Sequence, residues 1–283
     1  MSKDAKKLAS RNANRSRTPH SPQFMKYIGS NWADRENKLP KADAVAPFAA
    51  KRRAAVAKAF KGKVVVIEAG NMKQRSNDTE YRFRAHSAFA HLTGWGTHTV
   101  PGSILVIDAR KGSKATLFFR ETAGHDTDEF FANSAIGEFW VGSRPGLKQV
   151  AALLGLPTKS LKTYDEFIKS VAKKDVVTLD DASVAEFVSE LRLVKDAFEI
   201  AEMRKAVAAS VEGFKSVVRN LDKAVKHPRG ERIVEGAFFA EARANGNDLG
   251  YETIAAAGEH ACTLHWIIND GKVNKGDLLL LDA

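Results

Sequence analysis

From about residue 43 onward, short apolar runs alternate with stripes of apolar residues at helical spacing. Apolar and β-branched runs predict strands at 64–67, 103–108, 115–119 and 176–179. Spacings of three and four residues predict helices, and these helices cover 43–60, 147–154, 165–172 and 182–193. Strands that alternate with helices in this way indicate an α/β domain.

A second domain is predicted to begin near Val194. Asp196 and Glu199 form a capping-box pattern that starts a helix. That helix carries a continuous apolar stripe, made of Ile200, Val207, Val211, Phe214, Val218 and Leu221. The break at 227–230 is followed by a second predicted helix over 231–244. We therefore divide the chain into a basic extension (1–41), an α/β domain (42–193) and the incomplete first part of another domain (194–283).

The final residues predict a buried strand that ends at a carboxylate. Four consecutive leucines, Leu278–Leu281, lie between two aspartates, and a strand covered on both faces is apolar at successive positions. Asp282 then lies where the strand leaves the core, a usual place for a metal-binding or catalytic carboxylate. Chain ends normally lie at the surface, so we expect the chain to be a fragment that stops just after its first functional carboxylate.

The net charge of +10 belongs mainly to the first 41 residues, which hold ten Lys or Arg and only three Asp or Glu. This extension lacks apolar periodicity before Phe24, so we expect it to be disordered. Attraction to RNA or to a membrane surface is the alternative interpretation of the extension. Because the remaining residues are nearly neutral, we do not expect nucleic acid to be a partner of the folded domains.

Composition is that of a globular protein, with 44% hydrophobic and 28% charged residues. No apolar run reaches the roughly 20 residues that a membrane helix needs, and no signal-peptide core follows Met1. The single cysteine, Cys262, excludes an intrachain disulfide framework and is typical of a reducing compartment. We expect a cytoplasmic protein with no membrane partner.

Candidate chemistry is concentrated between 258 and 283. His260, Cys262 and His265 lie close in sequence, but in a strand the first two would face away from the third, which argues against three ligands of one metal. His265, beside Trp266 and shortly before the carboxylate strand, is the better candidate. The alternatives are a hydrogen-bonded core histidine for His265 and a turn residue for Asp282.

Several motifs resemble the aminopeptidase P (Xaa-Pro aminopeptidase) family. They are RSNDTEYRFR at 75–84, EFWVGSR at 138–144, LRLVKDAFEI at 191–200 and the segment 245–283, and they occur in the family's order across about 24–283. The resemblance implies an α/β fold: a creatinase-like N-terminal α/β domain followed by the first part of an α+β pita-bread catalytic domain.

The resemblance also implies roles for individual residues. Asp282 matches the first metal ligand of a dinuclear centre, which usually holds two manganese ions. His265 matches a catalytic pocket histidine that binds the substrate or its tetrahedral intermediate. Asp78, Trp140 and Arg144 match substrate-binding positions that, in tetrameric relatives, line the active site of a neighbouring subunit. The alternatives are an Asx-turn for Asp78 and ordinary core packing for Trp140.

The implied function is metal-dependent removal of the N-terminal residue that precedes proline in peptides. The implied partners are peptides with proline in second position and further copies of the chain, as a dimer or tetramer. Because two metals need more ligands than one aspartate, we expect the chain over 1–283 to be inactive. Two alternatives remain: a prolidase-like or creatinase-like hydrolase, and a non-catalytic binding module. Retention of His265 and Asp282 argues against the latter.

Overall fold

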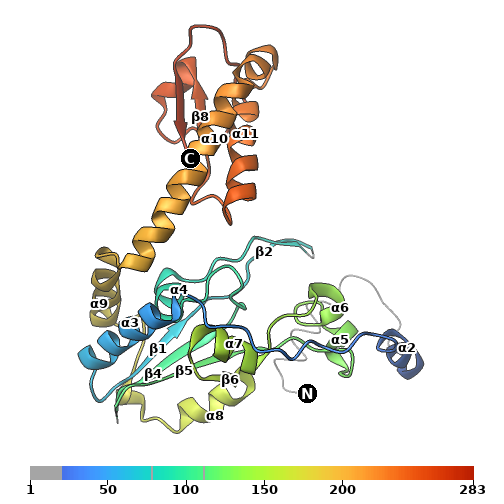
Figure 1. The fold of residues 1–283 in the computed structure, drawn as a ribbon, viewed down its shortest axis with the longest axis vertical. Helices are drawn as coiled ribbons and strands as arrows, with labels where there is room; N and C mark the ends of the chain where they lie inside the picture. Colours follow the sequence, from blue (N-terminus) through green and yellow to red (C-terminus); the bar gives the residue numbers. More distant parts are fainter. Residues whose placement is uncertain (1–20, 78, 111) are drawn as a thin grey trace. The chain divides into compact units, whose positions relative to one another are not determined.

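The computed structural model describes residues 21–77, 79–110 and 112–283. The chain forms two compact units, with most contacts made inside each unit. The first unit ends at Val194 and the second begins at Lys195 (Figure 1). Each unit has its own hydrophobic core. In the part of the chain that the structure describes, no helix is long and apolar enough to cross a membrane.

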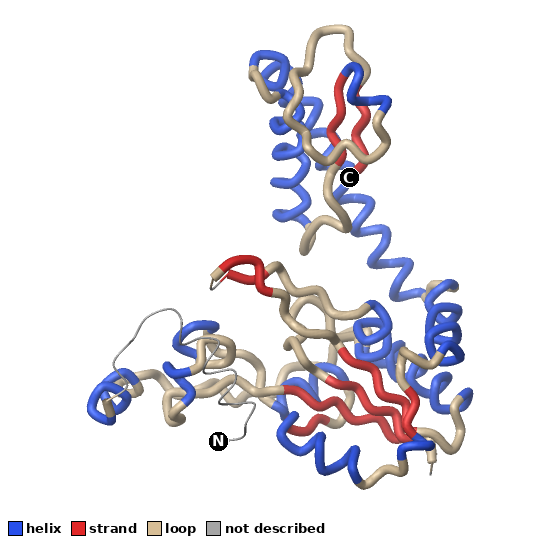
Figure 2. The backbone as a smooth tube through the Cα atoms, turned by 180° about the vertical axis from the view of Figure 1, so that it is seen from behind, coloured by secondary structure: helices blue, strands red, loops and turns tan. Residues whose placement is uncertain are grey.

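A five-stranded mixed sheet forms the centre of the first unit (Figure 2). β1 (Val64–Glu68), β4 (Ile104–Asp108) and β5 (Lys114–Phe119) are antiparallel neighbours. β6 (Thr158–Ser160) pairs in parallel with β5, and β7 (Val176–Val177) pairs in parallel with β1. The strand order is therefore β6-β5-β4-β1-β7. The strands predicted at 64–67, 103–108 and 115–119 are confirmed, whereas the one predicted at 176–179 is only two residues long.

Alternate residues of the strands face two separate cores, as the pleat of a sheet requires. Val65, Ile67 and Leu105 belong to the larger core, and Val64 and Val66 belong to the smaller one. Four helices pack on the larger core, namely α3 (Ala46–Ala59), α4 (Ser87–Thr93), α7 (Leu147–Leu154) and α9 (Ala182–Leu193). The smaller core is closed by α8 (Tyr164–Lys169), which lies between the 3-10 turns η1 (Leu161–Thr163) and η2 (Lys173–Asp175).

Two smaller parts of this unit have no counterpart in the sequence prediction. One is a short exposed hairpin, β2 (Gln74–Ser76) with β3 (Thr79–Glu80). The other is an aromatic cluster carried by three short helices, α2 (Pro22–Ile28), α5 (Glu129–Ala132) and α6 (Glu138–Val141), and by Trp32, which follows α2. Its rings meet edge to face or tilted, and they come from Phe24, Trp32, Phe130, Phe131, Phe139 and Trp140. Residues 22–28 thus form a helix within the extension that we expected to be disordered, and residues 1–20 of that extension lie outside the described residues.

The second unit packs two helices against a two-stranded sheet. α10 (Ala197–Lys226) and α11 (Gly230–Asn245) match the two predicted helices. β8 (Ile254–Ala257) pairs antiparallel with β9 (Leu279–Asp282). The 3-10 helix η3 (Gly258–Cys262) follows β8 directly.

The predicted capping box at the start of α10 is present. The Glu199 backbone N–H donates to Asp196 Oδ1 at 3.0 Å, and the Asp196 N–H donates to Glu199 Oε2 at 3.0 Å. Two of the four N–H groups left unpaired at the start of a helix are often satisfied in this reciprocal way. The cap explains why this helix begins where the sequence predicted.

The face that α10 buries differs from the predicted one. α11 packs against a row of small residues on α10, with Gly213, Ser216, Val217 and Ala224 buried. Most of the predicted apolar stripe is exposed, with Val218 at 68%, although Leu221 packs against the core and the Phe214 ring meets Phe238 edge to face. Small residues allow two helices to approach closely, and α11 packs on the face of α10 that carries them. Leu278 is 82% exposed and the three leucines of β9 are half-buried, so the described residues do not cover this strand on both faces.

Candidate functional site

The strand pair β8–β9 and the loop between η3 and β9 carry the predicted residues of the second unit. Asp282 is the last residue of β9 and lies opposite Ile254 of β8. Its side chain is exposed, and its Oδ1 accepts a hydrogen bond from the Tyr251 hydroxyl. This hydrogen bond, with smaller effects from burial and the carboxylate charge, raises the pKa of Tyr251. Asp282 is therefore an accessible carboxylate that a neighbouring tyrosine holds in place.

His265 lies in the loop between η3 and β9, and its side chain is exposed. Its carbonyl oxygen accepts from the Ile267 N–H at 3.0 Å, and the Trp266 N–H donates to Thr263 at 3.1 Å. These two turns fix the backbone on both sides of His265. The imidazole has no hydrogen bond to the residues that the structure describes, so the alternative of a hydrogen-bonded core histidine does not fit its position.

The described residues do not form a metal site by themselves. Nowhere in residues 21–283, with 78 and 111 left aside, do three His, Cys, Asp or Glu side chains come close enough to hold an ion. The argument that His260, Cys262 and His265 do not share a metal assumed a strand, and that assumption is wrong, because 258–262 is a 3-10 helix. Asp282 can supply one carboxylate to a metal, and one carboxylate is too few for a closed site.

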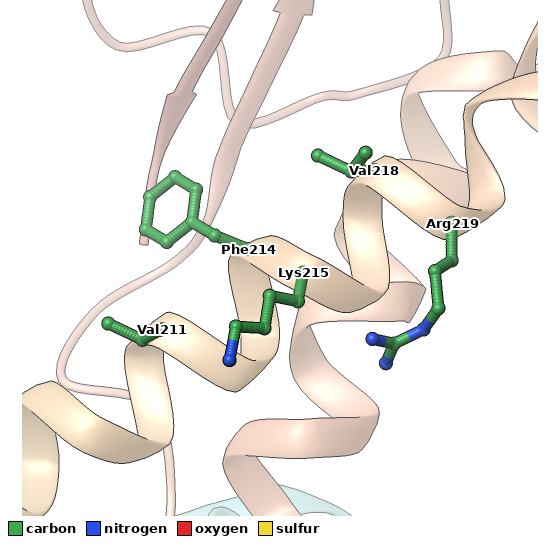
Figure 3. Close-up of a pocket in the computed structure, with 5 residues that line it drawn as sticks. All are labelled: Val211, Phe214, Lys215, Val218 and Arg219. Atoms are coloured by element: carbon green, nitrogen blue, oxygen red, sulfur yellow. The ribbon is translucent and has the colours of Figure 1, made fainter.

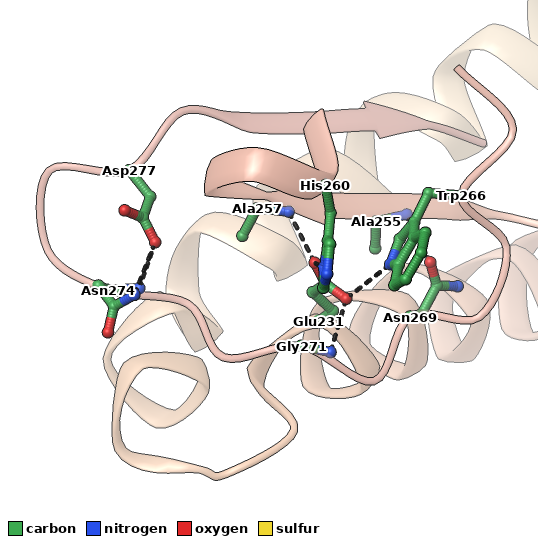
Figure 4. A network of polar contacts seen from close by, with 9 residues as sticks. All are labelled: Glu231, Ala255, Ala257, His260, Trp266, Asn269, Gly271, Asn274 and Asp277. Carbon is green, nitrogen blue, oxygen red and sulfur yellow. Dashed lines mark hydrogen bonds and ion pairs between the residues drawn. The ribbon is translucent and has the colours of Figure 1, made fainter. Parts of the chain in front are cut away.

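The strongest polar network of this unit surrounds Glu231, in the first turn of α11 (Figure 4). Its carboxylate is fully buried. Oε1 accepts from the Ala257 N–H at 2.8 Å and from His260 Nδ1 at 2.9 Å. Oε2 accepts from Trp266 Nε1 at 2.9 Å and from the Gly271 N–H at 2.7 Å.

The electrostatics of this carboxylate follow from those contacts. Burial alone would raise the pKa of Glu231, but the hydrogen bonds from Ala257, Trp266, His260 and Gly271 together lower it. The start of α11 adds a favourable helix dipole. An ionised carboxylate only accepts hydrogen bonds, so the bonded Nδ1 of His260 carries a proton. The imidazole also stacks on Trp266, with ring centroids 3.8 Å apart and planes at 23°.

A second buried side chain completes the anchoring of the same loop. Asn269 has a positive φ of 49° and is fully buried. Its Oδ1 accepts from the Ala255 N–H at 3.0 Å, and its Nδ2 donates to the Thr253 carbonyl at 2.8 Å. Asn269 and Glu231 therefore accept from the N–H groups of Ala255 and Ala257, respectively. These N–H groups lie on the edge of β8 that does not pair with β9 and would otherwise be open.

Sequence reasoning missed Glu231 and Asn269. Glu231 lies 26–40 residues from its four partners, so no local spacing connects them. The one available signal was an acidic residue in the first turn of an amphipathic helix. Such a residue is usually exposed to solvent and stabilises the helix by interacting with its dipole. Asn269 had a weak signal, because asparagine tolerates a positive φ in loops.

The predicted residues of the first unit have more ordinary surroundings. Trp140 is 51% exposed, meets the Phe131 ring at a tilt and the Phe139 ring edge to face, and donates its indole N–H to the Phe131 carbonyl at 2.8 Å. Arg144 is half-buried, and this burial lowers the pKa of its guanidinium. Asp78 lies outside the described residues. The structure thus gives Trp140 a packing role while the residue stays partly accessible.

A pocket on the exposed side of α10 is unrelated to these residues. It is lined by Val211, Phe214, Lys215, Val218 and Arg219 (Figure 3). Most of these belong to the apolar stripe that the sequence predicted to be buried. Its lining is mainly apolar, although Lys215 and Arg219 are among the residues that form it.

Comparison with known proteins relates both units to the same enzymes. Residues 49–178 match the family described as "Aminopeptidase P, N-terminal domain", and residues 201–283 match "Metallopeptidase family M24". The chain is 41% identical over 280 residues to Xaa-Pro aminopeptidase 1 of Streptomyces coelicolor, covering 93% of this chain and 56% of the relative. It is 40% identical over 281 residues to Xaa-Pro aminopeptidase 2 of the same organism, covering 93% of this chain and 58% of the relative.

Solved structures show the same fold at lower identity. Aminopeptidase P from E. coli superimposes with a TM-score of 0.69 at 22% identity, over 86% of this chain and 59% of that chain. A zinc-substituted form of the E. coli enzyme in complex with product gives the same values. The chain therefore spans somewhat more than half the length of these proteins. The predicted fold class, an α/β N-terminal domain followed by part of an M24 domain, is confirmed.

Proposed function

The chain belongs to the aminopeptidase P family of metallopeptidases, and from this premise we propose that the protein is an Xaa-Pro aminopeptidase. It removes the N-terminal residue that precedes proline in a peptide. The observation that carries this proposal is the similarity to two Xaa-Pro aminopeptidases over 93% of the chain, through both units and in the same order. The predicted prolidase-like activity has no comparable support in these matches.

Asp282 and His265 are the residues that would act in this reaction. Asp282 would give a carboxylate oxygen to a divalent metal, for which we propose manganese, since hard oxygen ligands suit that ion. The bound metals would supply an activated water and polarise the scissile carbonyl. Tyr251 fixes the rotamer of the Asp282 carboxylate through its hydroxyl. His265 is exposed and its imidazole is available to contact the peptide.

We further propose that the first unit contributes to substrate binding through Asp78, Trp140 and Arg144, in a homo-oligomer with two or four copies. The exposure of Trp140, at 51% for the residue, supports this, because a proline ring packs readily against an aromatic side chain. The half-buried guanidinium of Arg144 could bind a peptide carbonyl or carboxylate. A cytoplasmic location is proposed on the single cysteine alone.

The test uses the full product of the gene that encodes this chain, whatever its length, purified with manganese. It should release the first residue from Xaa-Pro-Xaa tripeptides, and removal of metal by a chelator should abolish release. Asp282→Asn and His265→Ala should each lower kcat/KM by at least about 100-fold. The matched control is Asp277→Asn, because Asp277 lies in the loop before β9 and its carboxylate accepts hydrogen bonds from Asn274. Metal-independent cleavage, or full activity of Asp282→Asn, would refute the proposal.

A further inference from the structure

Glu231 is a buried acid that the proposed chemistry does not use. Burying a carboxylate is costly unless it is fully hydrogen-bonded. Here all four bonds are made, two to backbone N–H groups and two to aromatic nitrogen atoms. No Lys or Arg pairs with Glu231 among the described residues, and its basic neighbour is the imidazole of His260, with Nδ1 2.9 Å from Oε1. A residue that only filled the core would not need a buried carboxylate, because an apolar side chain fills the same volume without the cost of desolvating a charge.

The four donors come from three separate segments. Ala257 ends β8, His260 belongs to η3, and Trp266 and Gly271 belong to the loop that carries His265. Figure 4 shows these groups converging on the one carboxylate from different parts of the chain. The carboxylate therefore joins the start of α11 to the strand, the 3-10 helix and the loop at once. An apolar side chain of similar size would fill the space but could not connect these segments.

The loop also approaches Glu231 more closely than most side chains would allow. A Cβ at Gly271 would lie 2.7 Å from Nδ1 of His260 and 2.9 Å from Cδ of Glu231. Trp266 is held on two sides, by its hydrogen bond to Oε2 and by the stacked imidazole of His260. The neighbouring His265 is exposed, while Trp266 is half-buried. Anchoring the Trp266 side chain thus fixes the backbone from which the His265 side chain projects.

We infer that Glu231 is a positioning residue: through His260 and Trp266 it holds the loop so that His265 is presented in one fixed orientation. The inference rests on the proposed function only for the role of His265; the anchoring itself is a separate claim. Groups that contact a substrate need such support, because a loosely held side chain loses the geometry on which catalysis depends. Asn269, bonded to Thr253 and Ala255, secures the other end of the same loop.

The deciding variant is Glu231→Gln. A glutamine of the same shape must turn an NH2 group toward at least one backbone N–H, either that of Ala257 or that of Gly271, so the network cannot be completed. In the 283-residue chain, the backbone order parameter of His265, measured by 15N relaxation, should fall below about 0.6. Exchange of the Trp266 indole proton should accelerate by about tenfold or more, as expected when a hydrogen bond to a charged group is lost. The indoles of Trp32, Trp95 and Trp140 lie in the other unit and should not change.

Val217→Ala is the matched control, because Val217 packs in the core of the same unit and makes none of the Glu231 contacts. It should lower the melting temperature while leaving the order parameter of His265 and the Trp266 exchange rate unchanged. If Glu231→Gln leaves both readouts unchanged, or if Val217→Ala moves them equally, the inference is overturned.

Activity separates this inference from the proposed function. In the full gene product, Glu231→Gln should reduce kcat more than it changes KM. Activity at the wild-type rate in Glu231→Gln, alongside loss in His265→Ala, would overturn the positioning role and leave the proposed function intact. If the wild-type product cleaves no Xaa-Pro peptide, the proposed function fails, and the relaxation and exchange measurements still decide whether Glu231 orders the loop.

Discussion

The Glu231 backbone N–H donates to the Gly271 carbonyl at 3.1 Å, and the Gly271 N–H donates back to Glu231 Oε2 at 2.7 Å. This reciprocal pair ties the first turn of α11 to the loop that precedes β9. It satisfies one of the N–H groups that a helix leaves unpaired at its start, and it brings the two segments into direct contact. The closeness of the contact makes residue 271 sensitive to any added atom.

Gly271→Ala should therefore destabilise the second unit. The new Cβ would meet the His260 ring and the Glu231 carboxylate below 3 Å, and overpacking of this kind costs about 1–3 kcal/mol. Urea denaturation followed by circular dichroism measures the change. Gly250→Ala is the control, because a Cβ at Gly250 has no neighbour within 4 Å. Equal midpoints for the two variants would contradict the tight approach at Gly271.

Two glycines inside the helices give a second, paired prediction. A Cβ at Gly213 of α10 would lie 2.7 Å from the Phe238 ring of α11, whereas a Cβ at Gly236 would meet nothing within 4 Å. Gly236→Ala should stabilise the unit by up to about 1 kcal/mol through helix propensity. Gly213→Ala gains the same propensity but should be net destabilising by about 1–2 kcal/mol. Stabilisation by both variants, seen in thermal unfolding, would mean that α11 does not pack at Gly213.

The stability of the second unit should depend on pH through Glu231. The folded state lowers the pKa of this carboxyl below its ordinary value of 4.5, since its hydrogen bonds outweigh its burial. Because the pKa is lower in the folded state, the ionised Glu231 stabilises that state fully at any pH above the pKa of the unfolded state. This stabilisation disappears as the pH falls through the pKa of the folded state. The difference in unfolding free energy between wild type and Glu231→Gln should thus be largest near pH 7 and shrink toward pH 3. A constant difference across urea titrations from pH 7 to pH 3 would contradict the ionised network.

Much of the fold could be predicted because its signals are local. The runs at 64–67 and 103–108 are apolar on both faces, and both faces of their sheet are indeed covered. The helix over 182–193 was predicted with its observed bounds, and the Asp196 cap fixed the next helix start. Strand β6 was missed because three residues, Thr158–Ser160, carry too little pattern.

The errors came from tertiary packing, which overrides local pattern. The stripe on α10 follows helical spacing over many turns, yet α11 packs on the side of Gly213 and Val217, where the missing side chain at Gly213 leaves room for Phe238. Local motifs drew attention to His265 and Asp282, and family resemblance gave them roles. The Glu231 network could not be predicted, because its partners become neighbours only when α11, β8 and the loop assemble.

Manganese binding by the 283-residue chain should be weak and located at Asp282. The described residues provide one carboxylate there and no cluster of three ligating side chains, and a single carboxylate binds such ions poorly. Addition of Mn²⁺ should broaden the NMR signals of Asp282 and Tyr251 without saturating at concentrations that saturate the full gene product. Asp282→Asn should remove the broadening. Tight, stoichiometric binding by the 283-residue chain would show that other residues complete a site.

The last prediction concerns the tyrosine that holds Asp282. The hydrogen bond from the Tyr251 hydroxyl to Asp282 favours the protonated phenol, and the carboxylate charge adds to this, so the pKa of Tyr251 is raised. Asp282→Asn removes the negative charge and weakens the bond, and the pKa of Tyr251 should fall. NMR titration of 13Cζ-labelled tyrosines between pH 8 and pH 12 measures this directly, with Tyr251→Phe to assign the signal. Asp277→Asn removes a negative charge from the loop before β9, where Asp277 pairs with Asn274. It should leave the pKa of Tyr251 unchanged. If Asp282→Asn gives the same curve as Asp277→Asn, Tyr251 does not hold the carboxylate, and the proposed metal ligand lacks its support.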